Sequence, residues 1–295
     1  GGDTLRIVTT IFPVFDWTRE VLGDRIQEAE ITMLLSSGVD LHSFQPTAAD
    51  ILKISACDVF IYVGGESDDW VADALSEATN DGMIVLDLMD ALGDRAKEEE
   101  LAEGMTVEEA ESEGDEPEYD EHVWLSLQNA EYLCGEIAAA LSEADPDNAA
   151  VYAENAAAYG AELAELDERF IAAVEESSVD TLVFGDRFPF RYLTDDYGLT
   201  YYAAFSGCSA ESEASFETIL FLAGKVDELG LSHVMTIEGA DHRIAETIID
   251  TTETKDQTIL ELDSMQSVTA KDVEAGMSYL ARMEHNLDVL RDALR

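Results

Sequence analysis

The sequence predicts an α/β protein with two β/α lobes, each built on a parallel sheet, joined by one long rigid helix. Short β-rich apolar runs alternate with amphipathic helical stretches in both halves of the chain. An Ala/Glu/Leu-rich stretch with no proline, from 149 to 176, separates the two halves. At about 1.5 Å per residue it forms a rod of roughly 40 Å, longer than either lobe needs.

The first part of the chain, residues 3–145, is expected to form the N-terminal β/α lobe. The predicted strands are apolar runs bounded by turn residues: Leu5–Ile11, Glu28–Leu35, Asp58–Val63 and Met83–Leu88. A helix start is predicted at Pro46, with Thr47 as the N-cap and Asp50 in the capping-box position.

The β/α alternation is lost between residues 94 and 121. This segment holds many acids, two glycines and a proline, and it has few apolar residues. Such a composition predicts a mobile surface loop, which we call the acidic loop. Order is expected to return at His122, in the stretch YDEHVWLSLQNA, with a helix ending near Asp145.

The linker helix is predicted over 146–177, starting at Pro146, and the C-terminal β/α lobe over 178–295. Its strands are expected at Thr181–Phe184, Thr200–Phe205, His233–Ile237 and Thr258–Leu262. Its helices are expected in FPFRYLTDDYG, at Phe216–Leu229, at Arg243–Thr251, and as one closing helix from Lys271 to the C-terminus.

Charge limits the classes of partner. The chain of 295 residues has 65 Asp and Glu against 16 Lys and Arg, a formal net charge of −49 at pH 7. Such a field repels phosphate backbones and anionic lipids, so no nucleic-acid partner is expected, and cations are favoured. Most of these carboxylates are read as a general adaptation to solubility or salt, so a metal site must rest on particular residues.

The three cysteines do not form a disulfide framework, because their number is odd and no CxxC spacing occurs. Cys57 lies in an apolar run and Cys134 on a helical face, which is typical of buried free thiols. Cys208 differs, because it lies in the polar segment SGCSAESEAS and is expected to be more exposed.

Candidate metal ligands follow the predicted strands, where parallel sheets bind their ligands. His42 follows the second strand, Glu238 the strand ending at Ile237, and Asp263 the last strand, while His122 enters its helix from a loop. Imidazole and carboxylate together suit a first-row divalent cation. The plainer alternative is a surface or capping role for each of them.

No signature of catalysis is present. The sequence has no GxSxG, no Walker loop and no GxGxxG, so the chain is expected not to be an enzyme. His233, His242 and His285 are assigned to structural roles. Of these three, His242 lies nearest to Glu238 in the sequence.

Several motifs in order resemble one family. GVDLHSFQPTAADI, DVFIYVGG, the acidic loop leading into YDEHVWLSLQNA, the long helix and ILELDSM are similar to the substrate-binding proteins of zinc and manganese ABC importers, cluster A-I. The resemblance runs from about Leu5 to Leu294. It implies two β/α lobes joined by a rigid helix, with the metal held in the cleft between them.

The resemblance also implies a ligand set. The first histidine motif supplies His42, the HVWL motif supplies His122, and the residue after the last strand is Asp263. Family members usually carry a histidine or glutamate where this chain has Gly185, which has no side chain to coordinate. Glu238 is ranked first for the fourth position, followed in no fixed order by Asp186, a bidentate Asp263, Cys208 or a water molecule.

The function implied is an extracytoplasmic receptor that captures Zn(II) as cargo and delivers it to an ABC permease in the membrane, without turnover. We expect a monomer that is lipid-anchored, or periplasmic in a Gram-negative cell. The acidic loop favours zinc, since manganese-type members usually have a short connection there. The alternatives are a Mn(II) or Fe(II) receptor, a metal-stabilised surface adhesin, and, last, a metal-dependent hydrolase.

Overall fold

The computed structural model describes residues 4–106, 118–209 and 213–295. Contacts divide the chain into two compact units, each made of segments that are distant in sequence. Unit 1 comprises Gly1–Ala96, Leu127–Glu165 and Met265–Ala281. Unit 2 comprises Lys97–Ser126, Leu166–Ser264 and Arg282–Arg295. The division into 3–145, 146–177 and 178–295 stays a prediction.

Unit 1 contains a four-stranded parallel sheet in the order β2-β1-β3-β4. Its strands are β1 Leu5–Thr9, β2 Ala29–Met33, β3 Val59–Tyr62 and β4 Ile84–Asp87. In the central strand β1, Ile7 pairs with Ile31 on one side and with Val59 on the other. Ile7 and Val59 are at most 1% exposed, as expected for central parallel strands covered on both faces.

The helices of unit 1 are α1 Phe12–Leu22, α2 Ala48–Ala56, α3 Trp70–Ser76, α4 Leu88–Leu92, α5 Leu127–Ala144 and α10 Ala270–Glu274. Of these, α1, α4 and α5 pack against strands of the sheet. The predicted capping box of α2 is confirmed, since the side chains of Thr47 and Asp50 each accept a backbone N–H from the other. On α1, the fully buried Trp17 packs edge-on against Tyr279, with ring centroids 5.1 Å apart.

Unit 2 repeats the same strand order, β6-β5-β7-β8, again all parallel. Its strands are β5 Thr181–Phe188, β6 Thr200–Ser206, β7 His233–Ile237 and β8 Thr258–Leu262. Strand β5 is longer than predicted, and its register against β6 shifts between Phe184 and Arg187. This irregularity has the character of a β-bulge, which bends a strand and redirects its side chains.

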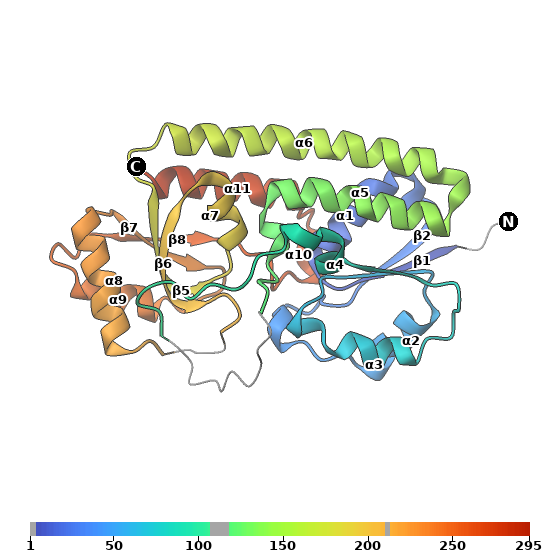
Figure 1. Cartoon of the computed structure of the whole chain (residues 1–295), viewed down its shortest axis with the longest axis horizontal. Coiled ribbons are helices and arrows are strands. Elements are labelled where there is room, and N and C mark those ends of the chain that lie inside the picture. The colour runs from blue at the N-terminus through green and yellow to red at the C-terminus, as the bar shows by residue number, and fades with distance from the viewer. Residues whose placement is uncertain (1–3, 107–117, 210–212) are drawn as a thin grey trace. The chain divides into compact units, whose positions relative to one another are not determined.

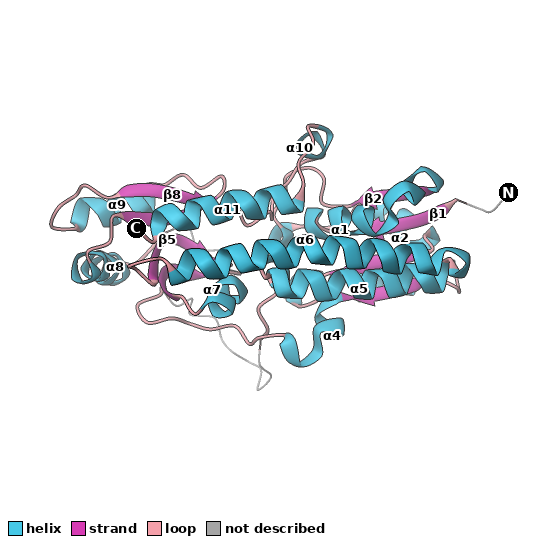
Figure 2. Cartoon of the chain, turned by 90° about the horizontal axis from the view of Figure 1, so that it is seen from above, coloured by secondary structure: helices cyan, strands magenta, loops and turns pink. Residues whose placement is uncertain are grey.

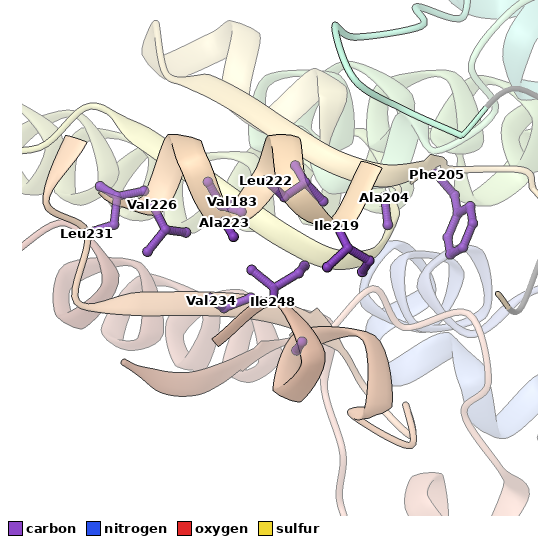
Figure 3. Packing of buried hydrophobic residues seen from close by; sticks show 11 residues of the cluster. Val183, Ala204, Phe205, Ile219, Leu222, Ala223, Val226, Leu231, Val234 and Ile248 are labelled. Atoms are coloured by element: carbon purple, nitrogen blue, oxygen red, sulfur yellow. The ribbon is translucent and has the colours of Figure 1, made fainter. Parts of the chain in front are cut away.

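The core of unit 2 lies between the sheet and two helices, α8 Phe216–Leu229 and α9 Arg243–Thr251 (Figure 3). Leu222 and Val226 of α8 and Ile248 of α9 are each 0% exposed and pack with Val183 and Val234 of the strands. Helix α7, Arg191–Tyr197, follows β5. The predicted bounds of α8, α9, β7 and β8 are confirmed residue for residue, because each apolar run is delimited by turn residues.

Helix α6, Ala149–Glu175, is the long predicted helix, and the boundary between the two units falls within it. Its first part runs beside α5 within unit 1 (Figures 1 and 2). The fold prediction of two parallel β/α lobes and a long helix is therefore confirmed. Among the described helices, none is both long and apolar enough to cross a membrane.

One helix prediction was wrong. The closing segment from Lys271 is not a single helix, because α10 ends at Glu274 and α11 begins only at Tyr279. The chain turns at Gly276, whose N–H donates to the carbonyl of Val273. Helix α11 then continues to Ala293.

The described ends of the acidic loop make backbone hydrogen bonds, and its predicted mobility stays a prediction. The N–H of Glu99 donates to Glu118 across the loop, and that of Asp120 donates to Lys97. The N–H of Thr106 donates to the Ala204 carbonyl of β6. The prediction for 107–117 lies outside the described residues.

Candidate metal centre

His42 lies in unit 1, in the 3₁₀ turn Leu41–Ser43 that follows β2. Its backbone N–H donates to the carboxylate of Asp40 at 3.0 Å, which caps the turn. Its half-buried ring places Nδ1 2.7 Å from the hydroxyl oxygen of Ser67, which comes after β3. A hydrogen bond at Nδ1 leaves the role of coordinating atom to Nε2.

His122 belongs to unit 2 and is 0% exposed. It directly precedes the 3₁₀ turn Val123–Leu125, whose apolar side chains enter the core. Asp120 Oδ1 accepts the backbone N–H of His122 at 2.9 Å and lies 2.8 Å from Nδ1 of its ring. Because an ionised carboxylate can only accept, the ring carries its proton on Nδ1 and presents Nε2 as a ligand atom.

Trp124 anchors the His122 turn to the end of β8. Its indole N–H donates to the backbone carbonyl of Ser264 at 2.8 Å, and the indole is 0% exposed. The two aromatic rings of Trp124 and His122 lie 5.4 Å apart, centroid to centroid. His122 is thus held through its ring, its backbone and its neighbour, as a fixed metal ligand requires.

Gly207 and Cys208 form the turn after β6, and this turn lies against His122. A Cβ atom on Gly207 would be 2.8 Å from Cε1 of His122 and 2.9 Å from the carbonyl oxygen of Phe188. Only glycine therefore allows the imidazole to approach this closely. Cys208 is half-buried, and its sulfur and a ligand atom of His122 lie within 4.8 Å of one another. Two ligands of one tetrahedral zinc ion fall within that limit, at roughly 3.5 Å from each other.

Glu238 and Asp263 are neighbours at the carboxyl ends of β7 and β8. Both carboxylate oxygens of Glu238 accept hydrogen bonds from Ser264, one from its N–H and one from its hydroxyl, each at 2.7 Å. Asp263, 8% exposed, lies 3.3 Å from Nη1 of Arg282, and its N–H donates to Asn286. Burial raises the pKa of Glu238 to about 7, and the charge on Asp263 adds to that rise.

The packing of α9 explains why residue 185 has no side chain. A Cβ atom there would lie 2.6 Å from Cα of Ala245 and 2.8 Å from its backbone nitrogen. A side chain at 185 would therefore collide with α9. Asp186, next in the bulge, accepts the N–H groups of Arg187 and Ile237, and burial raises its pKa.

A carboxylate missed by the sequence analysis, Glu99, comes from the acidic loop. Burial raises its pKa, the charges of Asp120 and Glu118 raise it further, and a hydrogen bond with Ser206 and the charge of His122 oppose this. Its Oε1 atom is buried with no hydrogen-bond partner in the described part of the chain. Excess negative charge around His122 attracts a cation. The local sequence gave no signal for Glu99, because its partners are distant in sequence.

The predicted ligands come from segments of both units. His42 is in unit 1, whereas His122, Glu238 and Asp263 are in unit 2. Within unit 2, His122 lies with Cys208, and Glu238 lies with Asp263. Cys208 was only one of several lesser candidates in the sequence, although its place directly after a strand is the usual place for a ligand.

Comparison with known proteins identifies the family. The chain is 32% identical to the zinc-binding lipoprotein AdcA of Streptococcus pneumoniae over 97% of this chain and 55% of that protein. It is 27% identical to the high-affinity zinc uptake system protein ZnuA of Bacillus subtilis over 99% of this chain and 88% of that protein. Its structure matches the Zn(II)-bound ZnuA-like domain of S. pneumoniae AdcA with a TM-score of 0.75 and 29% identity, covering 99% of both chains.

The chain spans about half the length of the AdcA relatives that it matches. The family model covers nearly the whole of this chain, residues 7–293. The chain therefore belongs to the ZnuA family, described as the zinc-uptake complex component A, periplasmic.

Proposed function

We propose that this chain is an extracytoplasmic receptor that captures Zn(II) and delivers it to the permease of an ABC importer. The observation that carries the proposal is His122, a fully buried imidazole whose Nδ1 lies beside Asp120. A buried histidine supported by a carboxylate is the usual form of a zinc ligand. The names of the relatives, zinc-binding lipoprotein and zinc uptake system protein, agree with it.

The proposed ligand set begins with His42 and His122 and includes Asp263. Zn(II) takes four ligands in its closed sites, and imidazole and carboxylate are both suitable. Glu238 is the sequence-based choice for the fourth position. Each of its oxygens accepts one hydrogen bond from Ser264, which holds the carboxylate against the end of β8 and leaves a lone pair on each oxygen.

Zinc is favoured over manganese by the donor set. Divalent ions bind imidazole sites in the order manganese below iron below zinc, whereas manganese prefers sites made of oxygen. A Mn(II) or Fe(II) receptor remains the alternative within the same family. The chain itself performs no turnover, because its groups serve to hold and release an ion.

The remaining parts of the proposal concern partners and location. The permease lies in the membrane, and the receptor is a monomer anchored by lipid or free in a periplasm. No nucleic acid is a partner, since a net charge of −49 repels phosphate backbones. The same charge concentrates divalent cations near the protein.

Calorimetric titration of the metal-free protein tests which ion is bound and how many ions bind per chain. We expect one Zn(II) per chain, bound much more tightly than Mn(II), with manganese unable to displace zinc in competition. His285→Ala is the matched control, because His285 is exposed on α11, and it should leave the titration unchanged. Absence of a stoichiometric zinc site, or displacement of zinc by manganese, would contradict the proposal.

Delivery requires a second test in cells. Deleting the gene should impair growth under zinc chelation, and added zinc should restore it. A strain carrying His122→Ala should behave like the deletion, and one carrying His285→Ala like the wild type. Growth of the deletion strain equal to wild type under chelation would exclude a role in zinc import and leave a metal-stabilised surface protein.

A further inference from the structure

Three side-chain carboxylates at the carboxyl edge of the unit 2 sheet already have hydrogen-bond or ionic partners. Asp186 accepts two backbone N–H groups, Glu238 accepts two hydrogen bonds from Ser264, and Asp263 lies beside Arg282. Each therefore balances part of its charge within unit 2. The turn after β6 contributes a different kind of donor to unit 2, the sulfur atom of Cys208.

The backbone around Cys208 is shaped to the imidazole of His122. Gly207 lets the ring pack against the turn, and any larger residue would strike both the ring and the carbonyl of Phe188. The sulfur of Cys208 and a donor atom of His122 consequently lie within 4.8 Å of one another. Two tetrahedral ligands of one zinc ion have that spacing or less, since Zn–S is about 2.3 Å and Zn–N about 2.0 Å.

The other two cysteines show what an unreactive thiol looks like in this chain. Cys57 is 1% exposed and lies with its sulfur 3.5 Å from that of Met83, and burial raises its pKa to about 12. Cys134 is 0% exposed within α5. Neither belongs to a described group of metal-binding side chains, whereas Cys208 does.

We propose that Cys208 is a direct thiolate ligand of the captured ion and fills the position that Gly185 leaves without a side chain. On binding, the S–H bond breaks, the sulfur keeps the electron pair and forms the S–Zn bond, and the proton leaves to solvent. This inference rests on the proposed zinc-binding function and specifies one of its ligands. It assigns Glu238 to a supporting role, holding Ser264 and the end of β8.

A thiolate ligand changes which ions bind best. Thiolates select soft or borderline ions such as zinc and cadmium, while carboxylates suit manganese. The preference for Zn(II) over Mn(II) should therefore depend on Cys208. Replacing sulfur with oxygen in Cys208→Ser should weaken zinc binding by at least about 10- to 100-fold, the loss typical even of groups that merely support a ligand. Manganese binding should change much less.

Cobalt substitution reports directly on whether sulfur is a ligand of the metal. Metal-free protein loaded with Co(II) should show a near-ultraviolet thiolate-to-cobalt charge-transfer band that titrates with one equivalent of metal. Cys208→Ser should lose that band, and Cys57→Ala should keep it. Glu238→Gln should also keep it, because the proposal gives Glu238 no metal bond.

The outcomes separate this inference from the function on which it rests. Stoichiometric metal binding without a charge-transfer band, unchanged in Cys208→Ser, would overturn the thiolate ligand and leave the zinc receptor intact. Failure to bind any divalent ion would overturn both. Loss of metal binding in Glu238→Gln, with the affinity of Cys208→Ser unchanged and no charge-transfer band in the wild type, would return the fourth position to Glu238.

A measurement on the wild type avoids any question of folding in the variants. The metal-free protein should react with iodoacetamide at Cys208, identified by peptide mass, because that residue is half-buried while Cys57 and Cys134 are buried. One equivalent of Zn(II) should slow this reaction at least tenfold, and Mn(II) at the same concentration should not. Equal alkylation with and without saturating zinc would contradict the proposal.

Discussion

Unit 1 and unit 2 share one strand order, yet each supports its histidine with a different kind of group. His42 is half-buried and its Nδ1 faces the hydroxyl of Ser67, whereas His122 is fully buried and its Nδ1 faces the carboxylate of Asp120. A hydroxyl can donate or accept, so it leaves the imidazole tautomer open. A carboxylate accepts only, fixes the proton on Nδ1 and makes the ring a stronger ligand. His122 is accordingly the more strongly preorganised of the two.

The largest effect is expected from removing that ligand. His122→Ala should weaken zinc binding more than about 100-fold, beyond the range for supporting groups, because a preorganised donor is lost. Calorimetry of the variant beside His285→Ala gives the comparison. A loss under tenfold would mean that His122 is a core histidine and not a ligand.

The next change tests the two supporting groups against each other. Asp120→Asn should weaken zinc binding by about 10- to 100-fold, because the amide no longer holds a full negative charge beside Nδ1. Ser67→Ala should cost less, since a neutral hydroxyl makes a weaker hydrogen bond than a carboxylate. Competitive titration with a fluorescent zinc chelator measures both variants. Equal losses of zinc affinity in the two variants would show that the two supporting groups contribute equally to binding.

Gly207→Ala tests the close approach in unit 2. The added methyl group would meet the ring of His122 and a backbone carbonyl, so unfolding free energy should fall by about 1–3 kcal/mol and zinc binding should weaken. Gly224→Ala is the control, because it lies in α8 with open space around it, and it should be neutral or slightly stabilising. Urea denaturation of the metal-free proteins separates the two. A tolerated Gly207→Ala would mean that the ring can shift.

The smallest effect concerns a carboxyl group of unit 2 that lies away from the proposed ligands. Burial raises the pKa of Asp196 to about 6, with the charge of Asp167 adding to the rise and the hydrogen bond from Ser126 opposing it. The unfolded chain ionises near the ordinary value of 3.8, so the folded state holds the proton over a wider range. Stability of the metal-free protein should therefore fall as pH rises from about 4 to 6.

Asp196→Asn removes this titration and should raise the unfolding free energy at pH 7 by about 1–2 kcal/mol relative to the wild type. The difference between the two proteins should vanish below about pH 4. Urea midpoints across pH 3.5 to pH 8 measure it. A gain independent of pH would point to a packing effect of the amide instead.

The sequence predicted the fold well because its signals are local. The runs that form β7, α8 and α9 carry their own boundaries, and the duplicated alternation of strand and helix predicts two parallel sheets. The same locality explains the missed break between α10 and α11. That break depends on a turn at Gly276, whose single glycine gave too weak a signal.

The candidate site could be predicted only in part. His42 and His122 were predicted as ligands from their motifs, which stays a prediction. The contact of His122 with Gly207 joins residues 85 positions apart and has no local sequence signal. The sequence shows that residue 185 is a glycine. The reason that a side chain does not fit there is a tertiary contact with the backbone of α9, which the sequence does not reveal. For the same reason Cys208 could not be ranked above Glu238 from the sequence, because its closeness to His122 is a tertiary contact.

A crystal structure of the zinc-loaded protein, with anomalous scattering measured on both sides of the zinc edge, tests the central claim most directly. The account predicts one zinc peak per chain, with Nε2 of His122 about 2.0–2.1 Å and the sulfur of Cys208 about 2.3 Å from the ion. A peak held only by surface carboxylates, with the His122 ring not bonded to the ion, would contradict it.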